Sequence, residues 1–180
     1  MINIALIGFM GTGKTTVGRK LAVVLGLEFM DTDDEIVRIT GMEIPRIFKK
    51  YGPIRFRSEE TLALKRLLRQ TGQVISTGGG IVLREENVRL LQENTFVVAL
   101  SASPEAVFER VGHLKNRPLL NCSDPRARIE ALLEERAGKY DFAHLTVDTS
   151  TLSTGQVTDT IARAYRDYCQ QNRRQPSDRV

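Results

Sequence analysis

The sequence predicts an α/β fold in which a parallel sheet is covered by helices on both faces, giving three layers. Apolar segments of strand length alternate with amphipathic helical segments along the chain, and this alternation is typical of βαβ units. A glycine-rich segment separates the first strand from the first helix. The 180 residues suffice for one domain with a substantial core, and no linker or repeat divides them.

The expected strands are short apolar runs, at residues 3–7, 27–31, 74–76, 96–100 and 145–147. Helices are expected where apolar residues recur every three or four positions. These segments are residues 15–25, 33–38, 44–50, 58–70, 85–92, 104–111, 126–140 and 156–170. Residues 1–171 should form the single domain, and the charged residues 172–180 should form a flexible basic tail.

Composition excludes several classes of function. The net charge is only +4, and no run of Lys and Arg alternates with aromatic residues, so we expect no nucleic-acid partner. The two cysteines, Cys122 and Cys169, lie outside any metal or redox motif. Two thiols in a chain of this length suggest a reducing compartment. There is no stretch of 18 apolar residues and no basic leader, which predicts a cytoplasmic protein without a membrane partner.

Residues 8–15 match the phosphate-binding pattern G-x-x-x-x-G-K-[ST], directly after a predicted strand and before a predicted helix. Glycines let backbone amides curl round a phosphate, and the helix N-terminus adds its positive end. Lys14 is expected to reach the β and γ phosphates of ATP, and the Thr15 hydroxyl to hold Mg²⁺. The remaining expected ATP ligands of this loop are Gly11, Thr12, Gly13 and Thr16. The alternative is a glycine-rich turn that binds nothing.

Two carboxylates, Asp31 and Asp33, follow the second predicted strand. They should project to the same side at the carboxyl end of the sheet, where open α/β folds bind ligands. Phosphoryl transfer to a hydroxyl needs a carboxylate near the attacking oxygen and acidic groups round the metal. We expect Asp33 to hold the acceptor hydroxyl and Asp31 to hold Mg²⁺ through water. The alternative is a helix N-cap at Asp33 or Asp34.

Two arginines are candidates for holding an anionic substrate. Arg57 and Glu60 are three residues apart, so the glutamate can fix the fork of an arginine that binds a carboxylate. Arg136 is the second candidate. The triple glycine at 78–80 indicates backbone packed against a ligand. The alternatives are solvated helix faces for the two arginines and a wide turn for the triple glycine.

The polar segment at about 112–125 stands where a lid could close over the phosphates. Its Arg117 could stabilise the transferring phosphoryl group as an arginine supplied in cis. The alternative, a surface loop with an incidental arginine, stays open on this segment alone.

Together these motifs resemble the shikimate kinase family, from about residue 4 to residue 148. They are the phosphate loop at 8–15, D-T-D at 31–33, F-R-x-x-E at 56–60, the triple glycine at 78–80, R-P-L-L at 117–120 and R-x-x-x-Y at 136–140. The resemblance implies a P-loop fold of the nucleoside-monophosphate-kinase type, with strand order 2-3-1-4-5. It implies transfer of the ATP γ-phosphate to the 3-hydroxyl of shikimate, on the route to chorismate and the aromatic amino acids.

The resemblance also assigns residues. Asp33 would bind the ring hydroxyls, and shikimate would be held by Arg57, Gly79, Gly80 and Arg136. The phosphates and the metal would be bound by Lys14, Thr15 and Arg117. The catalytic residues would be Lys14, Asp33 and Arg117. Arg110 would lie against adenine. One Mg²⁺ per subunit, a monomer, a lid at about 112–125 and a substrate-binding segment at about 33–60 are expected.

Two positions depart from the family pattern. Proline follows Gly52 where glutamate is frequent, which should change the stiffness of that loop. No arginine occurs at 148–155, so a hydrophobic or backbone contact is expected on that side of adenine.

Three other functions remain to be weighed. Another small-molecule kinase, such as a gluconate kinase, is the nearest alternative. A kinase-like protein that binds nucleotide without turnover should have lost Lys14, Asp33 or a substrate arginine, and none is lost. A GTPase should carry N-K-x-D, which the chain lacks.

Overall fold

A five-stranded parallel sheet forms the centre of the computed structural model, which describes residues 1–112, 122 and 124–173. The strands are β1 (Asn3–Gly8), β2 (Glu28–Asp31), β3 (Gln73–Ser76), β4 (Thr95–Ser101) and β5 (Leu145–Asp148). Their order is β2-β3-β1-β4-β5, and every neighbouring pair is parallel. The predicted fold class and strand order are therefore confirmed.

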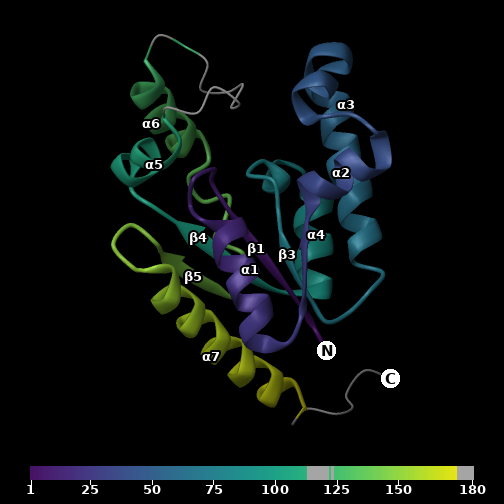
Figure 1. Cartoon of the computed structure of the whole chain (residues 1–180), viewed down its shortest axis with the longest axis vertical. Helices are drawn as coiled ribbons and strands as arrows, with labels where there is room; N and C mark the ends of the chain where they lie inside the picture. The colour runs from purple at the N-terminus through teal and green to yellow at the C-terminus, as the bar shows by residue number, and fades with distance from the viewer. Residues whose placement is uncertain (113–121, 123, 174–180) are drawn as a thin grey trace.

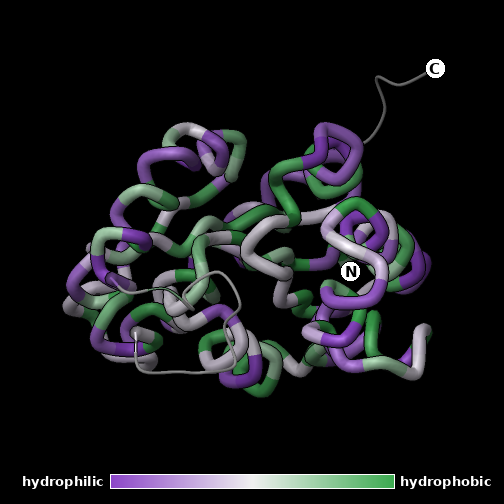
Figure 2. The backbone as a smooth tube through the Cα atoms, turned by 90° about the horizontal axis from the view of Figure 1, so that it is seen from above, coloured by the Kyte–Doolittle hydropathy of each residue, from purple (hydrophilic) through white to green (hydrophobic). Residues whose placement is uncertain are grey.

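Helices cover both faces of the sheet (Figure 1). They are α1 (Lys14–Leu25), α2 (Thr32–Thr40), α3 (Ile44–Leu67), the 3₁₀ helix η1 (Ile81–Leu83), α4 (Glu85–Asn94), α5 (Pro104–Val111), α6 (Pro125–Glu135) and α7 (Thr154–Arg173). Hydrophobic and hydrophilic residues are both present along the tube of each helix, as expected of helices that each bury one face (Figure 2). Among these helices, none has the length and apolarity needed to cross a membrane.

The central strand β1 explains how the layers form. All six of its residues are buried, which is typical of a parallel strand with helices on both sides. Ile4 and Leu6 pack in the cluster that α1 and α7 cover, whereas Ala5 and Ile7 pack in the cluster below α3 and α4. This alternation follows from the two-residue period of a strand.

Two smaller groups of helices stand beyond the carboxyl ends of the strands (Figure 1). Helices α5 and α6 share a core with Phe9 of the phosphate loop. Helices α2 and α3 share a separate core round Ile36 and Ile47. The glycine-rich loop after β1 lies between these two groups, so ligands bound there can be reached from both sides.

Several helices differ from the expected segments. The segments expected at 44–50 and 58–70 are joined as α3, which is broken at Gly52 (φ 76°, ψ 178°), with Pro53 starting its second half. The helix expected at 126–140 ends at Glu135, because Gly138 has a positive φ of 75° and turns follow. Helix α7 continues to Arg173, two residues into the segment expected to be tail. The short helix η1 was not expected.

Candidate active site

The phosphate loop connects β1 to α1, and its glycines adopt conformations that other residues avoid. Gly8 has a φ of 140°, and a Cβ there would overlap the carbonyl oxygen of Leu100 on β4. Lys14 is 8% exposed, and its Nζ donates to the carbonyl oxygens of Gly8 (2.9 Å) and Phe9 (2.8 Å). The lysine side chain therefore lies against the loop whose bound phosphates it is expected to contact.

Three oxygen-bearing side chains meet at the start of α1. Thr15 Oγ1 donates to Asp31 Oδ2 at 3.1 Å and lies 3.3 Å from Ser76 Oγ at the end of β3. Hydroxyl and carboxylate oxygens are ligands that suit Mg²⁺. Within the described ranges, no three His, Cys, Asp or Glu residues cluster as a metal site. Such a donor set fits a Mg²⁺ ion that takes most of its ligands from phosphate and water.

Asp31 also caps helix α2, since its Oδ1 accepts a hydrogen bond from the Asp33 amide at 3.0 Å. The capping alternative considered for Asp33 or Asp34 was therefore wrong by two or three residues, because the helix begins at Thr32. This cap orients the first turn of α2, which carries Asp33.

The triple glycine is held against that turn. Thr32, which is fully buried, accepts a hydrogen bond from the Gly78 amide at 2.9 Å. A Cβ on Gly78 would lie 2.7 Å from Glu60 Oε1 and 3.1 Å from Asp33 Oδ1. Two carboxylates thus flank Gly78, and glycine is required there for lack of space. Thr32 was missed at the sequence level, because its contact partner is 46 residues away.

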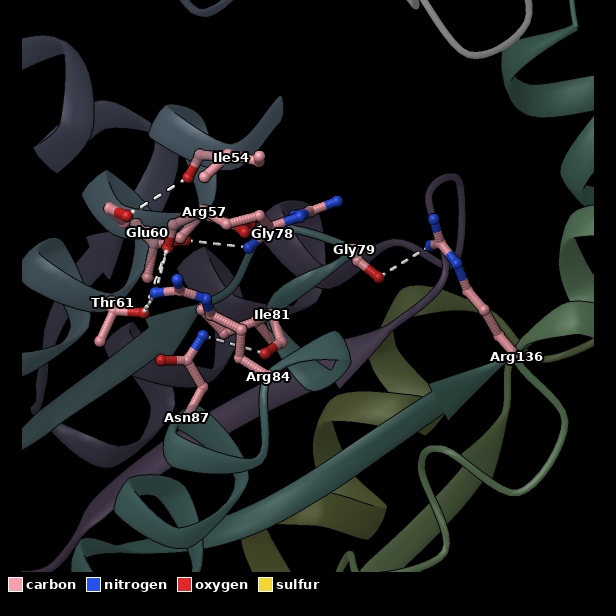
Figure 3. Close-up of polar contacts among 12 residues, drawn as sticks. Ile54, Arg57, Glu60, Thr61, Gly78, Gly79, Ile81, Arg84, Asn87 and Arg136 are labelled. Carbon is pink, nitrogen blue, oxygen red and sulfur yellow. Dashed lines mark hydrogen bonds and ion pairs between the residues drawn. The ribbon is translucent and has the colours of Figure 1, made fainter. Parts of the chain in front are cut away.

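Arg57 and Glu60 form the ion pair that their spacing predicts (Figure 3). Glu60 is 1% exposed, and burial raises the pKa of its carboxyl group, an effect opposed by the charges and hydrogen bond of nearby arginines, Arg57 first. The Arg57 guanidinium also packs on Gly80, where a Cβ would overlap it. Among the described residues, Glu60 Oε1 has no hydrogen-bond partner.

Arg136 reaches the triple glycine from the other side (Figure 3). Its Nη1 donates to the Gly79 carbonyl oxygen at 2.8 Å, and the Tyr140 hydroxyl donates to the same oxygen at 3.3 Å. The guanidinium lies 5.0 Å from the centre of the Phe9 ring. Arg136 is only 4% exposed, so the alternative of a solvated helix face was wrong for this residue. Its Nε has no hydrogen-bond partner in the described part of the chain.

A cavity of about 350 Å³ brings most of these groups together. It is lined by Met10, Gly11, Gly13, Lys14, Thr15, Thr16, Asp31, Asp33, Ser76, Thr77, Gly78, Gly79, Arg110 and Val111. Arg57, Gly80 and Arg136 do not line it, but they contact one another or Gly79 at its edge. Thr12 is buried, with its hydroxyl donating to the Phe9 carbonyl oxygen at 2.8 Å.

A second cavity of about 200 Å³ shares Gly13, Thr16 and Arg110 with the first. Its other side is formed by residues after β5, among them Thr149 and Leu152. Arg110 is fixed at its wall, donating to the Thr149 carbonyl oxygen (2.6 Å) and hydroxyl (3.1 Å) and to the Gly11 carbonyl oxygen (3.2 Å). The segment at 148–155, which contains no arginine, therefore still contacts the phosphate loop through Thr149, a residue that sequence reasoning missed.

One expected site residue is not placed. Arg117, with most of the segment expected as a lid, lies outside the described residues.

Comparisons with known proteins agree on one family. The family model described as shikimate kinase matches residues 10–166. A shikimate kinase from Pelotomaculum thermopropionicum is 52% identical over 168 residues, which cover 93% of this chain and 98% of the relative. The solved structure of a shikimate kinase from Acinetobacter baumannii in complex with shikimate has a TM-score of 0.89 at 39% identity, covering 93% of this chain and 94% of that one. The crystal structure of a shikimate kinase from Aquifex aeolicus has a TM-score of 0.78 at 33% identity, with coverage of 93% and 98%.

Proposed function

The chain belongs to the shikimate kinase family, and we propose that the cavity beside its phosphate loop is where it transfers the γ-phosphate of ATP to the 3-hydroxyl of shikimate. The protein is a kinase that phosphorylates shikimate in aromatic amino acid biosynthesis. The residues that line and border the cavity divide into a nucleotide half round the phosphate loop and an acceptor half round the triple glycine.

The nucleotide half of the site is built mainly from backbone. Gly11, Gly13 and Thr16 line the cavity at the start of α1, where the helix dipole favours a phosphate. Lys14 would exchange its two carbonyl partners for phosphate oxygens when ATP binds, since charged acceptors form the stronger bonds. Arg110, held by Thr149, would face the nucleoside at the boundary between the two cavities.

Mg²⁺ would be held by Thr15 directly and by Asp31 through water, because these oxygens lie side by side at the phosphate loop. When bound, Mg²⁺ would neutralise charge that develops on the phosphate oxygens. Ser76 Oγ, 3.3 Å from Thr15 Oγ1, would orient the threonine hydroxyl.

The acceptor half is built mainly from side chains. Arg57 and Arg136 would bind the carboxylate of shikimate with charge-assisted hydrogen bonds, and they contact Gly80 and the Gly79 carbonyl oxygen, respectively. Asp33 would accept a hydrogen bond from the hydroxyl that attacks phosphorus and receive its proton during transfer. Lys14 and Arg117 would stabilise the charge on the phosphoryl group as it moves.

The observation that supports this assignment best is the contact of two arginines with one glycine segment, opposite the phosphate loop. A coupled assay of ADP release with shikimate, with gluconate and with no acceptor tests it. We expect turnover with shikimate alone, because gluconate lacks the ring that would bring its hydroxyl to Asp33. Equal turnover with gluconate would contradict the assignment of the acceptor half.

Other features stay predictions. They are the single domain of residues 1–171, the lid at about 112–125, the substrate-binding segment at about 33–60, the tail at 172–180, the monomeric state and the cytoplasmic location.

A further inference from the structure

Arg84 lies outside the cavity but is bonded to the backbone of Arg57. It is the residue between η1 and α4, four positions after the triple glycine. Its Nη1 donates to Thr61 Oγ1 at 3.2 Å and to the Arg57 carbonyl oxygen at 3.4 Å, both on α3 (Figure 3). Thr61 Oγ1 itself donates to the Arg57 carbonyl oxygen at 3.1 Å. The three groups form a closed network that joins α3 to the segment carrying the triple glycine.

This network fixes the base of the Arg57 side chain, whereas Glu60 and Gly80 fix its far end. An arginine has several rotatable bonds, so the position of its guanidinium depends on the backbone from which it starts. The backbone of α3 is interrupted at Gly52, five residues before Arg57. A contact from η1 and α4 therefore sets where the second half of α3 stands relative to the triple glycine.

Arg84 also contributes charge. The Glu60 carboxylate is faced by Arg57 on its own helix, by Arg136 after α6 and by Arg84 before α4, and each of the three positive charges favours its ionised form. Asp33 on α2 lies across Gly78 from it. Because ionised Glu60 holds the Arg57 fork, removing the Arg84 charge weakens that pair without touching it.

We propose that Arg84 is a positioning residue for shikimate: it holds Arg57 in place through the Arg57 backbone and through Glu60, without contacting the substrate. The inference rests on the proposed role of Arg57 in binding the shikimate carboxylate.

A simple structural tie between α3 and α4 is the competing explanation, and the chain offers a control for it. Lys65 on α3 pairs with Glu86 on α4 at a site where both side chains are about half exposed. Lys65→Ala removes a link between the same two helices away from Arg57. Arg89→Ala removes an equal charge from α4, where Arg89 is 68% exposed and bonded only to Glu85 of its own helix among the described residues.

The test compares Arg84→Ala and Arg84→Lys with these two controls. Shikimate affinity is measured by titration calorimetry, KM for both substrates by the coupled assay, and Tm by calorimetry. For Arg84→Ala we expect shikimate Kd and KM to rise roughly fivefold, the effect of one hydrogen bond, with KM for ATP and kcat within twofold of the parent. Shikimate Kd and KM for Arg84→Lys should lie between those of the parent and of Arg84→Ala, because an ammonium group keeps the charge but not the planar geometry of the Nη1 group that donates to both acceptors. Both control variants should bind shikimate normally.

The dependence of shikimate affinity on pH separates positioning from stability. Affinity should weaken as the pH falls and Glu60 is protonated, and in Arg84→Ala this loss should begin at a higher pH than in the parent. Arg84→Lys should keep the parent profile. An unchanged Kd in Arg84→Ala, an unchanged profile, or an equal loss in Lys65→Ala would overturn the inference.

Two further variants keep the test decisive. If Arg84→Ala does not fold, Thr61→Val removes the shared hydroxyl, and we expect a loss of shikimate affinity of roughly threefold; parent-like affinity in Thr61→Val and Arg84→Lys would reject the proposal. Arg57→Ala tests the premise. If it leaves shikimate Kd unchanged, the carboxylate role of Arg57 fails, whereas a loss in Arg57→Ala with none in Arg84→Ala rejects only the role of Arg84.

Discussion

Gly80→Ala should weaken shikimate binding while leaving the fold almost intact. The backbone of Gly80 (φ −107°, ψ 7°) lies in a region that alanine can adopt, so conformational strain is small. The added methyl group overlaps the Arg57 guanidinium and nothing nearer. Since this is the end of a flexible side chain, the guanidinium moves rather than the backbone. Alanine keeps the amide N–H, so any loss reports the position of Arg57.

The magnitude depends on two competing costs. Leaving Glu60 buried without a partner would cost about 3–5 kcal/mol, whereas losing a charge-assisted bond to the substrate costs about 1.5–3 kcal/mol. The guanidinium should therefore turn about Glu60 and leave the substrate. We expect Tm to change by no more than a few degrees and shikimate Kd to rise roughly 10- to 150-fold.

Titration calorimetry and the coupled assay measure this effect, with Gly155→Ala on α7 as the matched control. Among the nearest atoms, the new Cβ of that variant meets a flexible lysine end and the nearby Ser153 hydroxyl, away from the triple glycine, so its Kd and KM for shikimate should equal those of the parent. If the shikimate Kd of Gly80→Ala were within twofold of the parent value, the position of Arg57 would not depend on the space that glycine leaves at residue 80. A fall in Tm like that of Glu60→Ala would show that the ion pair had broken instead.

Four other predictions concern the catalytic groups. Lys14→Ala should lower kcat roughly 10²- to 10³-fold with the fold intact, because it removes a fixed charge beside the phosphates; near-normal kcat would exclude the lysine from the mechanism. Asp33→Asn should lower kcat by about 10²- to 10⁴-fold, since an amide cannot accept the proton, and single-turnover rates measure this. Arg136→Ala should raise KM for shikimate roughly 10- to 100-fold and KM for ATP hardly at all, whereas equal changes would contradict a carboxylate role. Burial raises the pKa of Glu60 above its usual 4.5, so KM for shikimate should rise as the pH falls through the pKa that Glu60 has in the folded protein. The contribution of Glu60 to folding stability should instead increase as the pH falls over this range, and be lost as the pH rises. Urea unfolding and kinetics measure these two opposite trends, and Glu60→Gln should abolish both.

Local patterns predicted the groups whose geometry is set by neighbouring residues. The phosphate loop could be recognised because positive φ angles at its glycines and the following helix start are encoded within eight residues. The Arg57–Glu60 pair could be recognised because helix geometry alone brings residues three apart together. The strand order came from family resemblance, since periodicity predicts strands but not their neighbours.

Contacts between distant segments could not be predicted from such patterns. Gly80 and Arg57 touch although they are 23 positions apart, and only the packing of α3 on η1 brings them together. Arg136 was expected on a helix that continued to residue 140, but the helix ends before it and its side chain turns inward to Gly79. The sequence does carry a signal for that ending, a glycine at 138, but the surrounding residues favour a helix and outweigh it.

The charges of the acceptor half suggest why the Glu60 carboxylate is buried in a site that must bind a second carboxylate, that of shikimate. Three guanidinium groups, those of Arg57, Arg84 and Arg136, act on Glu60, and Asp33 lies across Gly78 from it. Three positive charges against two negative ones leave a single positive charge, which one carboxylate of the substrate neutralises. Without Glu60 the arginines would repel one another more strongly, and the Arg57 guanidinium would lose its ion-pair partner. The buried glutamate thus costs little affinity for the anion and holds Arg57 in the orientation that binding needs.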